Sequence, residues 1–218
     1  AEGLTNRVEQ YRFDLTTNQL TDRRVVLENI PGAQYHDGGR LAFGPDGYLY
    51  VTTGDATRPQ LAQDADSLAG KILRVNPDGT APVDNLFGNA VYSMGHRNAQ
   101  GLAWDSQGRL WSSEHGPSGA RSGFDEINLI KNGGNYGWPT IEGDEQAPGL
   151  TAPILQSGAD ETWAPGDVAI YNDTLFWPGL RGEALYSAKI TADGRLENPR
   201  VHFEGEFGRL RTAVVVGQ

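Results

Sequence analysis

Short apolar segments that alternate with polar residues and end at turn residues recur along the chain, and they predict a β-rich fold. Residues 8–15, VEQYRFDL, alternate as a half-buried strand should, and RRVVLENI at 23–30 is a possible partner. Three further stretches each combine an apolar strand, a tight turn and a second strand with an aromatic residue: LAFGPDGYLYV (41–51), LAWDSQGRLWS (102–112) and VAIYNDTLFW (168–177). Little helix is expected.

Single strands that end in turns lie between these hairpins, so that a larger unit repeats. They are GKILRVNPDG (70–79), DEINLIKNGG (125–134) and EALYSAKITADG (183–194). Four-stranded units repeated at this spacing are typical of a β-propeller. A β-sandwich with similar turns is the alternative.

The length of the chain limits how much of a propeller it can form. Propellers have about 4–8 blades, and 218 residues hold fewer than four complete units of this size. The last residues, RTAVVVGQ (211–218), are predicted to be a strand with no returning partner. We therefore expect residues 1–218 to form one partial propeller domain, with sequence missing at both ends.

Composition narrows the possible functions. The net charge of −10 argues against a nucleic-acid partner, which usually demands a basic surface. No apolar run is long enough to span a membrane. The absence of cysteine excludes disulfides, zinc–thiolate sites and a cysteine nucleophile. The first ten residues lack a basic and apolar leader, so we expect any signal peptide to have been removed.

Two polar segments precede the first two hairpins and are the leading candidates for chemistry. His36 lies in YHDGGR (35–40), where glycines permit close approach and a histidine can act as a general base. An inert surface histidine is the alternative. MGHRNAQGLAW (94–104) places Arg97 and Asn98 at the same point before the next hairpin. Both segments should therefore open on one end of the propeller.

Two other segments suggest ligands for a metal and for an anion. SSEHGPSGARSGFDEINLIKNGGNYGWP (112–139) is rich in turns and carboxylates, and calcium prefers carbonyl and carboxylate oxygens, but a Gly-rich connection is equally consistent with it. In GRLRTAVVV (208–216), Arg209 and Arg211 would share one face of a strand. They would either flank an anion or be solvated.

The motifs together resemble one known family. HDGGRLAFGPDGYLYVTTGD, LAGKILRVNPDG, GHRNAQGLAW, SEHGPSG, DEINLI, GGNYGWP and FGRLR occur in this order. The chain strongly resembles the soluble PQQ-dependent aldose sugar dehydrogenases, the glucose/sorbosone dehydrogenase family, from about residue 8 to its last residue. The resemblance implies an all-β fold, a six-bladed β-propeller of four-stranded antiparallel blades with PQQ over the central channel. The first blade and the end of the last would be missing here.

The resemblance also implies roles for particular residues. His36 would be the catalytic base, and Arg97 and Asn98 would lie beside the quinone. PQQ carboxylates would be bound by Arg209 and Arg211 and, on a less secure match, by Arg181. The remaining implied contacts are the carbonyls of Gly116 and Pro117 on the PQQ-bound calcium, Glu126 and Tyr136 on a structural calcium, and Trp163 in the substrate cleft.

One position departs from the family pattern. Well-studied glucose dehydrogenases of the family carry an aspartate just before the catalytic histidine, where this chain has Tyr35. Asp37, on the other side of His36, is the candidate substitute at the substrate end.

The implied reaction is oxidation of the anomeric carbon of an aldose to a lactone. His36 would take the hydroxyl proton while hydride passes to PQQ, and calcium would polarise the quinone carbonyl. An unidentified electron acceptor would follow, and the family is typically periplasmic or secreted. The alternatives are a non-catalytic propeller that binds other proteins and a calcium-dependent lactonase, which would have no use for Arg209 and Arg211.

Overall fold

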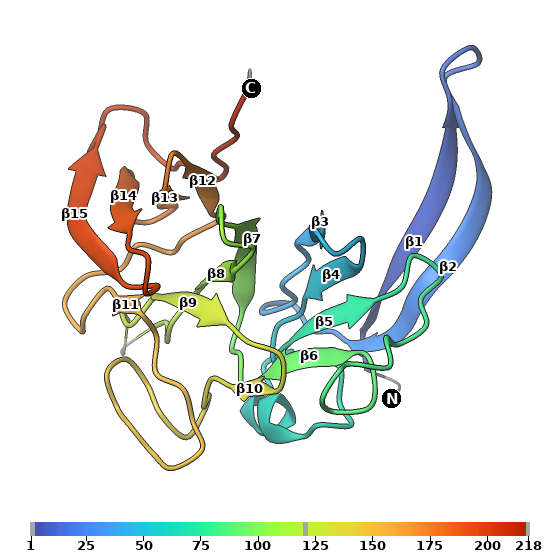
Figure 1. Ribbon diagram of the computed structural model, residues 1–218, viewed down its shortest axis with the longest axis horizontal. Helices are drawn as coiled ribbons and strands as arrows, with labels where there is room; N and C mark the ends of the chain where they lie inside the picture. The colour runs from blue at the N-terminus through green and yellow to red at the C-terminus, as the bar shows by residue number, and fades with distance from the viewer. Residues whose placement is uncertain (1–2, 120–121, 217–218) are drawn as a thin grey trace.

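The computed structural model describes residues 3–119 and 122–216, and nearly all of its regular structure is β-strand (Figure 1). The described helical structure is one short 3₁₀ turn, η1 (Pro59–Gln63), as the sequence predicted. No helix in these ranges is long and apolar enough to cross a membrane.

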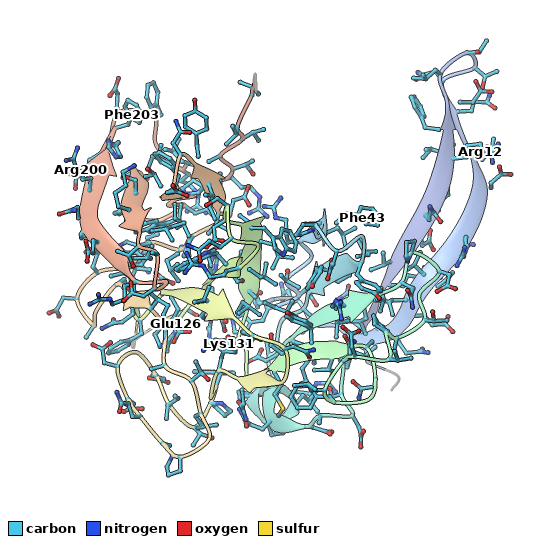
Figure 2. The ribbon with its side chains drawn as sticks, viewed as in Figure 1. Arg12, Phe43, Glu126, Lys131, Arg200 and Phe203 are labelled. Carbon is cyan, nitrogen blue, oxygen red and sulfur yellow. The ribbon has the colours of Figure 1, made fainter. Side chains whose placement is uncertain are left out.

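The first two strands form a long hairpin that extends from the body (Figure 1). β1 (Thr5–Asp14) pairs antiparallel with β2 (Gln19–Pro31), which confirms the two predicted strands and lengthens both. Arg12 lies near the far end of the hairpin in Figure 2. The near end of the hairpin packs against the body. Whether an apolar residue of the hairpin is buried therefore depends on how close it lies to the body, and not on strict alternation along the strand.

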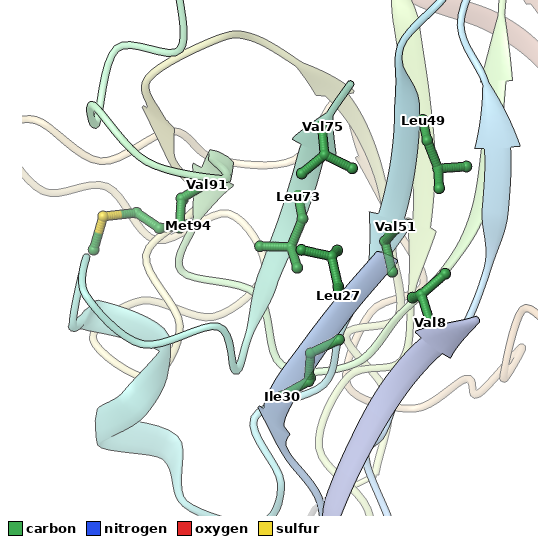
Figure 3. Packing of buried hydrophobic residues seen from close by; sticks show 9 residues of the cluster. All are labelled: Val8, Leu27, Ile30, Leu49, Val51, Leu73, Val75, Val91 and Met94. Atoms are coloured by element: carbon green, nitrogen blue, oxygen red, sulfur yellow. The ribbon is translucent and has the colours of Figure 1, made fainter. Parts of the chain in front are cut away.

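This near end contributes to the first hydrophobic core. Val8, Leu27 and Ile30 from the hairpin are buried against Val51 and Leu73 of the neighbouring sheet (Figure 3). Their burial anchors the hairpin, since a two-stranded ribbon alone is marginally stable in water.

The neighbouring sheet contains the first predicted hairpin. Its strand order is β10-β6-β5-β4-β3, in which β3 to β6 are antiparallel and β10 runs parallel to β6. The bounds are Leu41–Phe43 for β3, Leu49–Thr52 for β4, Lys71–Val75 for β5, Val91–Met94 for β6 and Gly134–Asn135 for β10. The strand at 91–94 was not predicted.

Two four-stranded antiparallel sheets follow. One has the order β11-β9-β8-β7, and the other has the order β12-β13-β14-β15. The bounds are Ala99–Trp104 for β7, Leu110–Glu114 for β8, Glu126–Ile130 for β9, Leu155–Gln156 for β11, Ala169–Tyr171 for β12, Thr174–Pro178 for β13, Leu185–Ile190 for β14 and Leu196–His202 for β15.

The sheets lie side by side, and their first strands meet. β7 contacts both β3 and β12, so the first strand of each sheet lies on a common inner side. One core, including Tyr50, Ile72 and Leu102, fills the space between the first two sheets. Another, including Trp111 and Trp177, joins the last two. The repeated four-stranded antiparallel unit is confirmed, while the number of six blades stays a prediction.

The predicted strand near the end of the chain is wrong for the described residues 211–216. This segment runs beside β12 without forming a strand. A cavity of about 420 Å³ separates Ala213–Val216 from side chains that include Tyr171 and Phe176. A run of apolar residues forms a strand only where a partner supplies ladder hydrogen bonds, and the described ladder of β12 is with β13, so its other edge makes none with residues 211–216.

Candidate active site

The segments before β3 and before β7 meet at one end of the sheets. The Gly38 N–H donates to the side-chain oxygen of Asn98 at 3.1 Å, and the Asp55 N–H donates to the Arg97 carbonyl at 2.8 Å. An isolated bridge between Gly54 and Asn98 closes the same contact. The expectation that these segments open on one end is therefore confirmed.

His36 is held by a buried carboxylate in this region. Its Nδ1 lies 2.9 Å from Oδ1 of Asp55, whose side chain is 1% exposed against 20% for His36. An ionised Asp55 accepts the Nδ1 proton, which leaves the Nε2 lone pair as the base. Within the described residues no hydrogen bond reaches Nε2. The aspartate therefore does for His36 what a triad aspartate does for its histidine.

The backbone around His36 explains the small residues of the motif. His36 itself has φ of +63°, and its carbonyl accepts the Ala56 N–H at 3.1 Å. A Cβ at Gly54 would lie 1.8 Å from that carbonyl oxygen. Glycine is therefore required at 54 for the two loops to approach.

The same carboxylate reaches an aromatic residue from a distant loop. Oδ2 of Asp55 accepts the indole N–H of Trp138 at 2.9 Å. The Arg97 guanidinium lies over the Trp138 ring, 5.5 Å from its centroid. Sequence reasoning missed Asp55 and Trp138. Both lie within motifs that were noticed, TTGD and GGNYGWP, but no local pattern signals their contact.

Arg97 presents a buried cation with neutral partners. Its guanidinium donates to the His115 carbonyl at 3.2 Å and to the Ser118 hydroxyl at 3.2 Å. Burial lowers its pKa, and the carboxylates of Asp55 and Glu114 act in the opposite direction. The charge is therefore available to an anion that enters the site.

A buried carboxylate on β8 holds the backbone of this segment. Glu114 accepts the N–H of Arg97 and, at 3.3 Å, the N–H of Asn98. Its other oxygen lies 2.8 Å from Nδ1 of His96, which is fully buried. The backbone orientation of Arg97 and Asn98 is thus fixed by a side chain of β8.

Arg40 connects this region to the third sheet. It donates to the Gln100 carbonyl at 3.1 Å and to the Gly166 carbonyl at 3.1 Å, and it pairs with Asp167 at 3.2 Å. Burial raises the pKa of Asp167, while Arg40 and Arg211 lower it. One side chain, four residues after His36, therefore joins the loop before β3 to β7 and to the loop before β12.

The other arginines singled out in the sequence lie on the surface. Arg209 and Arg211 are exposed and lie outside any strand. A Cβ at Gly166 would meet the Arg211 carbonyl oxygen at 2.5 Å, so the Arg211 backbone packs beside the Arg40 contacts. Arg181 is exposed in the loop between β13 and β14, not on a strand, because the chain turns back there. Their roles stay predictions.

Two residues that were predicted to contact the substrate, Trp163 and Asp37, make their contacts with other parts of the protein. Trp163 is only 6% exposed and packs against Trp177 and Tyr186 in the core between the last two sheets. The Asp37 carboxylate accepts the Asn6 amide at 2.7 Å and the Ala33 N–H at 3.0 Å. The partner of His36 is therefore Asp55 and not Asp37.

The metal candidates fall into two places. Gly116 packs against backbone oxygens, since a Cβ there would lie 2.2 Å from the Gly123 carbonyl. Its N–H donates to Asp125 at 2.9 Å. Pro117 follows it and is half-buried. Residues 3–119 and 122–216 contain no cluster of three His, Asp or Glu side chains arranged around a metal position.

The second place surrounds Glu126 on β9, inside the body in Figure 2. Burial and the nearby Glu114 raise its pKa well above the usual range. It accepts the amide of Asn128 at 3.0 Å, and the buried Asn128 oxygen has no hydrogen-bond partner in the described structure. Tyr136 lies in the adjoining core, where its ring stacks on His96.

Fold and site together define a class: an all-β, propeller-like protein whose polar site forms where loops from successive sheets converge. A histidine base, its carboxylate and a buried arginine lie in that site. This combination suits proton abstraction beside a bound anion.

Comparison with known proteins then identifies the family. The glucose/sorbosone dehydrogenase family profile matches residues 1–215. The chain is 38% identical over 178 residues to quinoprotein glucose dehydrogenase B of Acinetobacter calcoaceticus, and 34% identical over 185 residues to the aldose sugar dehydrogenase YliI of Escherichia coli K12. The chain belongs to the glucose/sorbosone dehydrogenase family.

A solved structure supports the fold over almost the whole chain. The PQQ-bound form of aldose sugar dehydrogenase from Streptomyces coelicolor superposes with a TM-score of 0.88 at 42% identity, covering 94% of this chain and 61% of that one. The curated relatives are longer than this chain. The matches cover 71% of this chain but 36% of the Acinetobacter protein, and 78% of this chain but 46% of the Escherichia coli protein.

Proposed function

We propose that this chain carries the base and part of the cofactor site of a PQQ-dependent dehydrogenase that oxidises aldoses at the anomeric carbon. The observation that carries the proposal is the buried Asp55 behind His36, next to the Arg97–Asn98 segment. Family membership supplies the class of reaction, and the contacts supply residues with the required chemistry.

His36 is the group that would accept the proton of the anomeric hydroxyl. Asp55 holds the imidazole in the tautomer with a free Nε2 and stabilises the imidazolium that forms. Gly39, close after His36, leaves space for a sugar, since no atom lies within 4 Å of a Cβ built there, whereas a Cβ at Gly38 would lie 2.7 Å from the Thr52 carbonyl oxygen. The product of the oxidation would be a lactone.

The residues present fit an anionic, planar cofactor. Arg97 is buried and donates only to neutral acceptors in the contacts described, so an anion can use its charge. Arg209 and Arg211 lie exposed at the end of the described chain and would reach carboxylates of the same cofactor. PQQ, when bound, supplies the two-electron acceptor.

Calcium fits the two oxygen-rich places. The Gly116 and Pro117 carbonyls would face a cofactor-bound ion, which would add Lewis-acid polarisation. Glu126 and the Tyr136 carbonyl would hold a structural ion. The unpaired, buried oxygen of Asn128 beside Glu126 supports this second site, since a cation would complete its bonding.

The remaining features follow the family and are proposals of the same kind. The substrate would be an aldose, electrons would leave to an acceptor that the chain does not identify, and the protein would act in the periplasm or outside the cell. A non-catalytic propeller would have no need for the His36–Asp55 pair, which disfavours that alternative.

The test is a titration of the chain with PQQ and calcium, followed by glucose or another aldose, with the cofactor absorbance recorded. Bleaching of oxidised PQQ that disappears in His36→Ala supports the proposal. His202→Ala, in the third sheet beside Ser187, is the matched control and should bleach normally. If PQQ binds but no aldose bleaches its absorbance, the site in this chain is not complete. Lactone hydrolysis that survives loss of both Arg209 and Arg211 favours the lactonase.

A further inference from the structure

Trp138 is the residue that touches both functional groups of the site. Its indole N–H donates to Oδ2 of Asp55 at 2.9 Å, and its ring lies beneath the Arg97 guanidinium at 5.5 Å. Its own backbone is fixed. The Trp138 N–H donates to the Gly95 carbonyl at 3.0 Å, and its carbonyl accepts the Gln63 amide at 2.7 Å. The side chain is therefore held from both flanks.

We propose that Trp138 is a positioning residue that couples the base to the cofactor-facing arginine. This inference rests on the proposed function. The indole N–H fixes the Asp55 carboxylate, and the ring face supports Arg97. One side chain thereby sets the orientation of the proton-accepting group and of the anion-binding group together.

The carboxylate contacts explain why the indole matters. Oδ1 of Asp55 already contacts Nδ1 of His36 at 2.9 Å and the Thr57 N–H at 2.8 Å. The Trp138 N–H occupies the other oxygen, so the plane of the carboxylate cannot turn. Since Asp55 is fully buried, loss of this donor leaves a charged oxygen without a partner. The carboxylate would then turn toward another donor and take the imidazole with it.

The contact with the Trp138 ring acts on the Arg97 guanidinium. A guanidinium over an aromatic face is attracted to it, more strongly when water is excluded. Arg97 is buried, and the charged groups around it include Asp55 and Glu114. The ring keeps the guanidinium from collapsing onto either carboxylate, so that its N–H groups stay directed at a ligand.

Two variants separate the two contacts. Trp138→Phe removes the N–H and keeps a ring, and Trp138→Leu removes both. In the PQQ-free chain, the low-field NMR resonance of the His36 Nδ1 proton should move in Trp138→Phe. In turnover assays kcat should fall roughly tenfold, as for outer-shell partners of metal-bound histidines, with PQQ affinity within about twofold of wild type. Trp138→Leu should also weaken PQQ binding about fivefold.

Trp111→Phe is the matched control. Trp111 donates its indole N–H to Asp105 at the same length, 2.9 Å, in the second sheet away from the site. Its loss should lower stability without moving the His36 resonance. If Trp138 had a merely structural role, Trp138→Phe would behave like Trp111→Phe, with lower stability and an unmoved His36 resonance.

The proposal is overturned if Trp138→Phe leaves the His36 resonance in place. Because that measurement needs neither sugar nor cofactor, it decides the coupling even if the chain shows no turnover. If Trp138→Phe does not fold, Asp55→Asn gives the reciprocal test. Of the five indole N–H signals, that of Trp138 should move, and an unmoved signal overturns the proposal.

Discussion

Lys71 is a buried ammonium whose surroundings predict a measurable pH dependence of stability. Its side chain is fully buried on β5, and Nζ donates to the carbonyls of Leu61, Ala62 and Ala69 at 2.7, 3.2 and 2.6 Å. Burial lowers its pKa from 10.5 to about 8, against a small opposing effect of Asp64. The three carbonyls tie the segment after Asp55 to the first sheet.

The sign of the pH dependence of stability follows from proton binding to Lys71 in the folded and unfolded chains. Between about pH 8 and pH 10.5 the unfolded chain binds a proton at Lys71 that the folded chain has lost, so wild-type stability rises with pH across that window. With these two pKa values, the free energy of unfolding should increase by about 1 kcal/mol from pH 7 to pH 9 through this one group. Lys71→Met lacks the group and should lack the increase.

The absolute effect of Lys71→Met at pH 7 should be small. Removing the charge relieves about 3 kcal/mol of burial cost, from the same pKa difference. The Ala69 carbonyl loses its partner, which costs about 1–3 kcal/mol, whereas the other two carbonyls keep the N–H groups of Asp64 and Gly95. The two effects nearly cancel.

The assay is urea unfolding of wild type and Lys71→Met at pH 7 and at pH 9. Groups common to both proteins cancel in the difference between them. Lys131→Met, at an exposed lysine on the loop after β9, is the control and should follow wild type at both pH values. A wild-type-minus-variant difference that is the same at both pH values would show that the carbonyls keep the ammonium charged, and would refute the reasoning.

Three further predictions concern the site and its supports. Gly54→Ala should cost about 3 kcal/mol in urea unfolding, because its Cβ would lie 1.8 Å from the His36 carbonyl oxygen, whereas Gly3→Ala, with open space around it and no positive φ, should cost far less; equal losses would contradict this. Calcium binding should release a proton from Glu126, whose pKa is raised, so calorimetry should find affinity rising with pH, and Glu126→Gln should abolish the rise. Arg40→Met should lower the free energy of unfolding by about 2 kcal/mol, and no change would show that its contacts are dispensable.

The parts of the fold that sequence predicted are those set by local chemistry. The hairpins at 41–51, 102–112 and 168–177 carry their turn residues and their apolar strands within one short stretch, and all three form. The error at 211–216 has the opposite cause. A continuous run of apolar residues, 213–216, is present there, but strand formation depends on a partner that the segment itself does not contain.

The same distinction between local and distant contacts applies to the residues of the site. His36 and Arg97 could be placed together because each precedes a hairpin at the same offset. Asp55 and Trp138 could not, since they are 83 residues apart and meet only because of how two loops cross. Spacing along the chain carries no information about such a crossing. The contact of Asp37 was misjudged for the same reason, because Asn6, in a different sheet, takes its carboxylate.

The contacts of Arg40 bear on how this protein can vary. Two of its three partners are main-chain carbonyls, those of Gln100 and Gly166, and every residue type offers a carbonyl. The Arg40 contact at position 100 therefore does not depend on the side chain there, although the Gln100 amide also donates to the Asn98 side-chain oxygen at 3.1 Å. At 166 the close Arg211 backbone restricts the choice to glycine. The junction thus rests largely on main-chain atoms, and the loops around it could be altered while the framework stays intact.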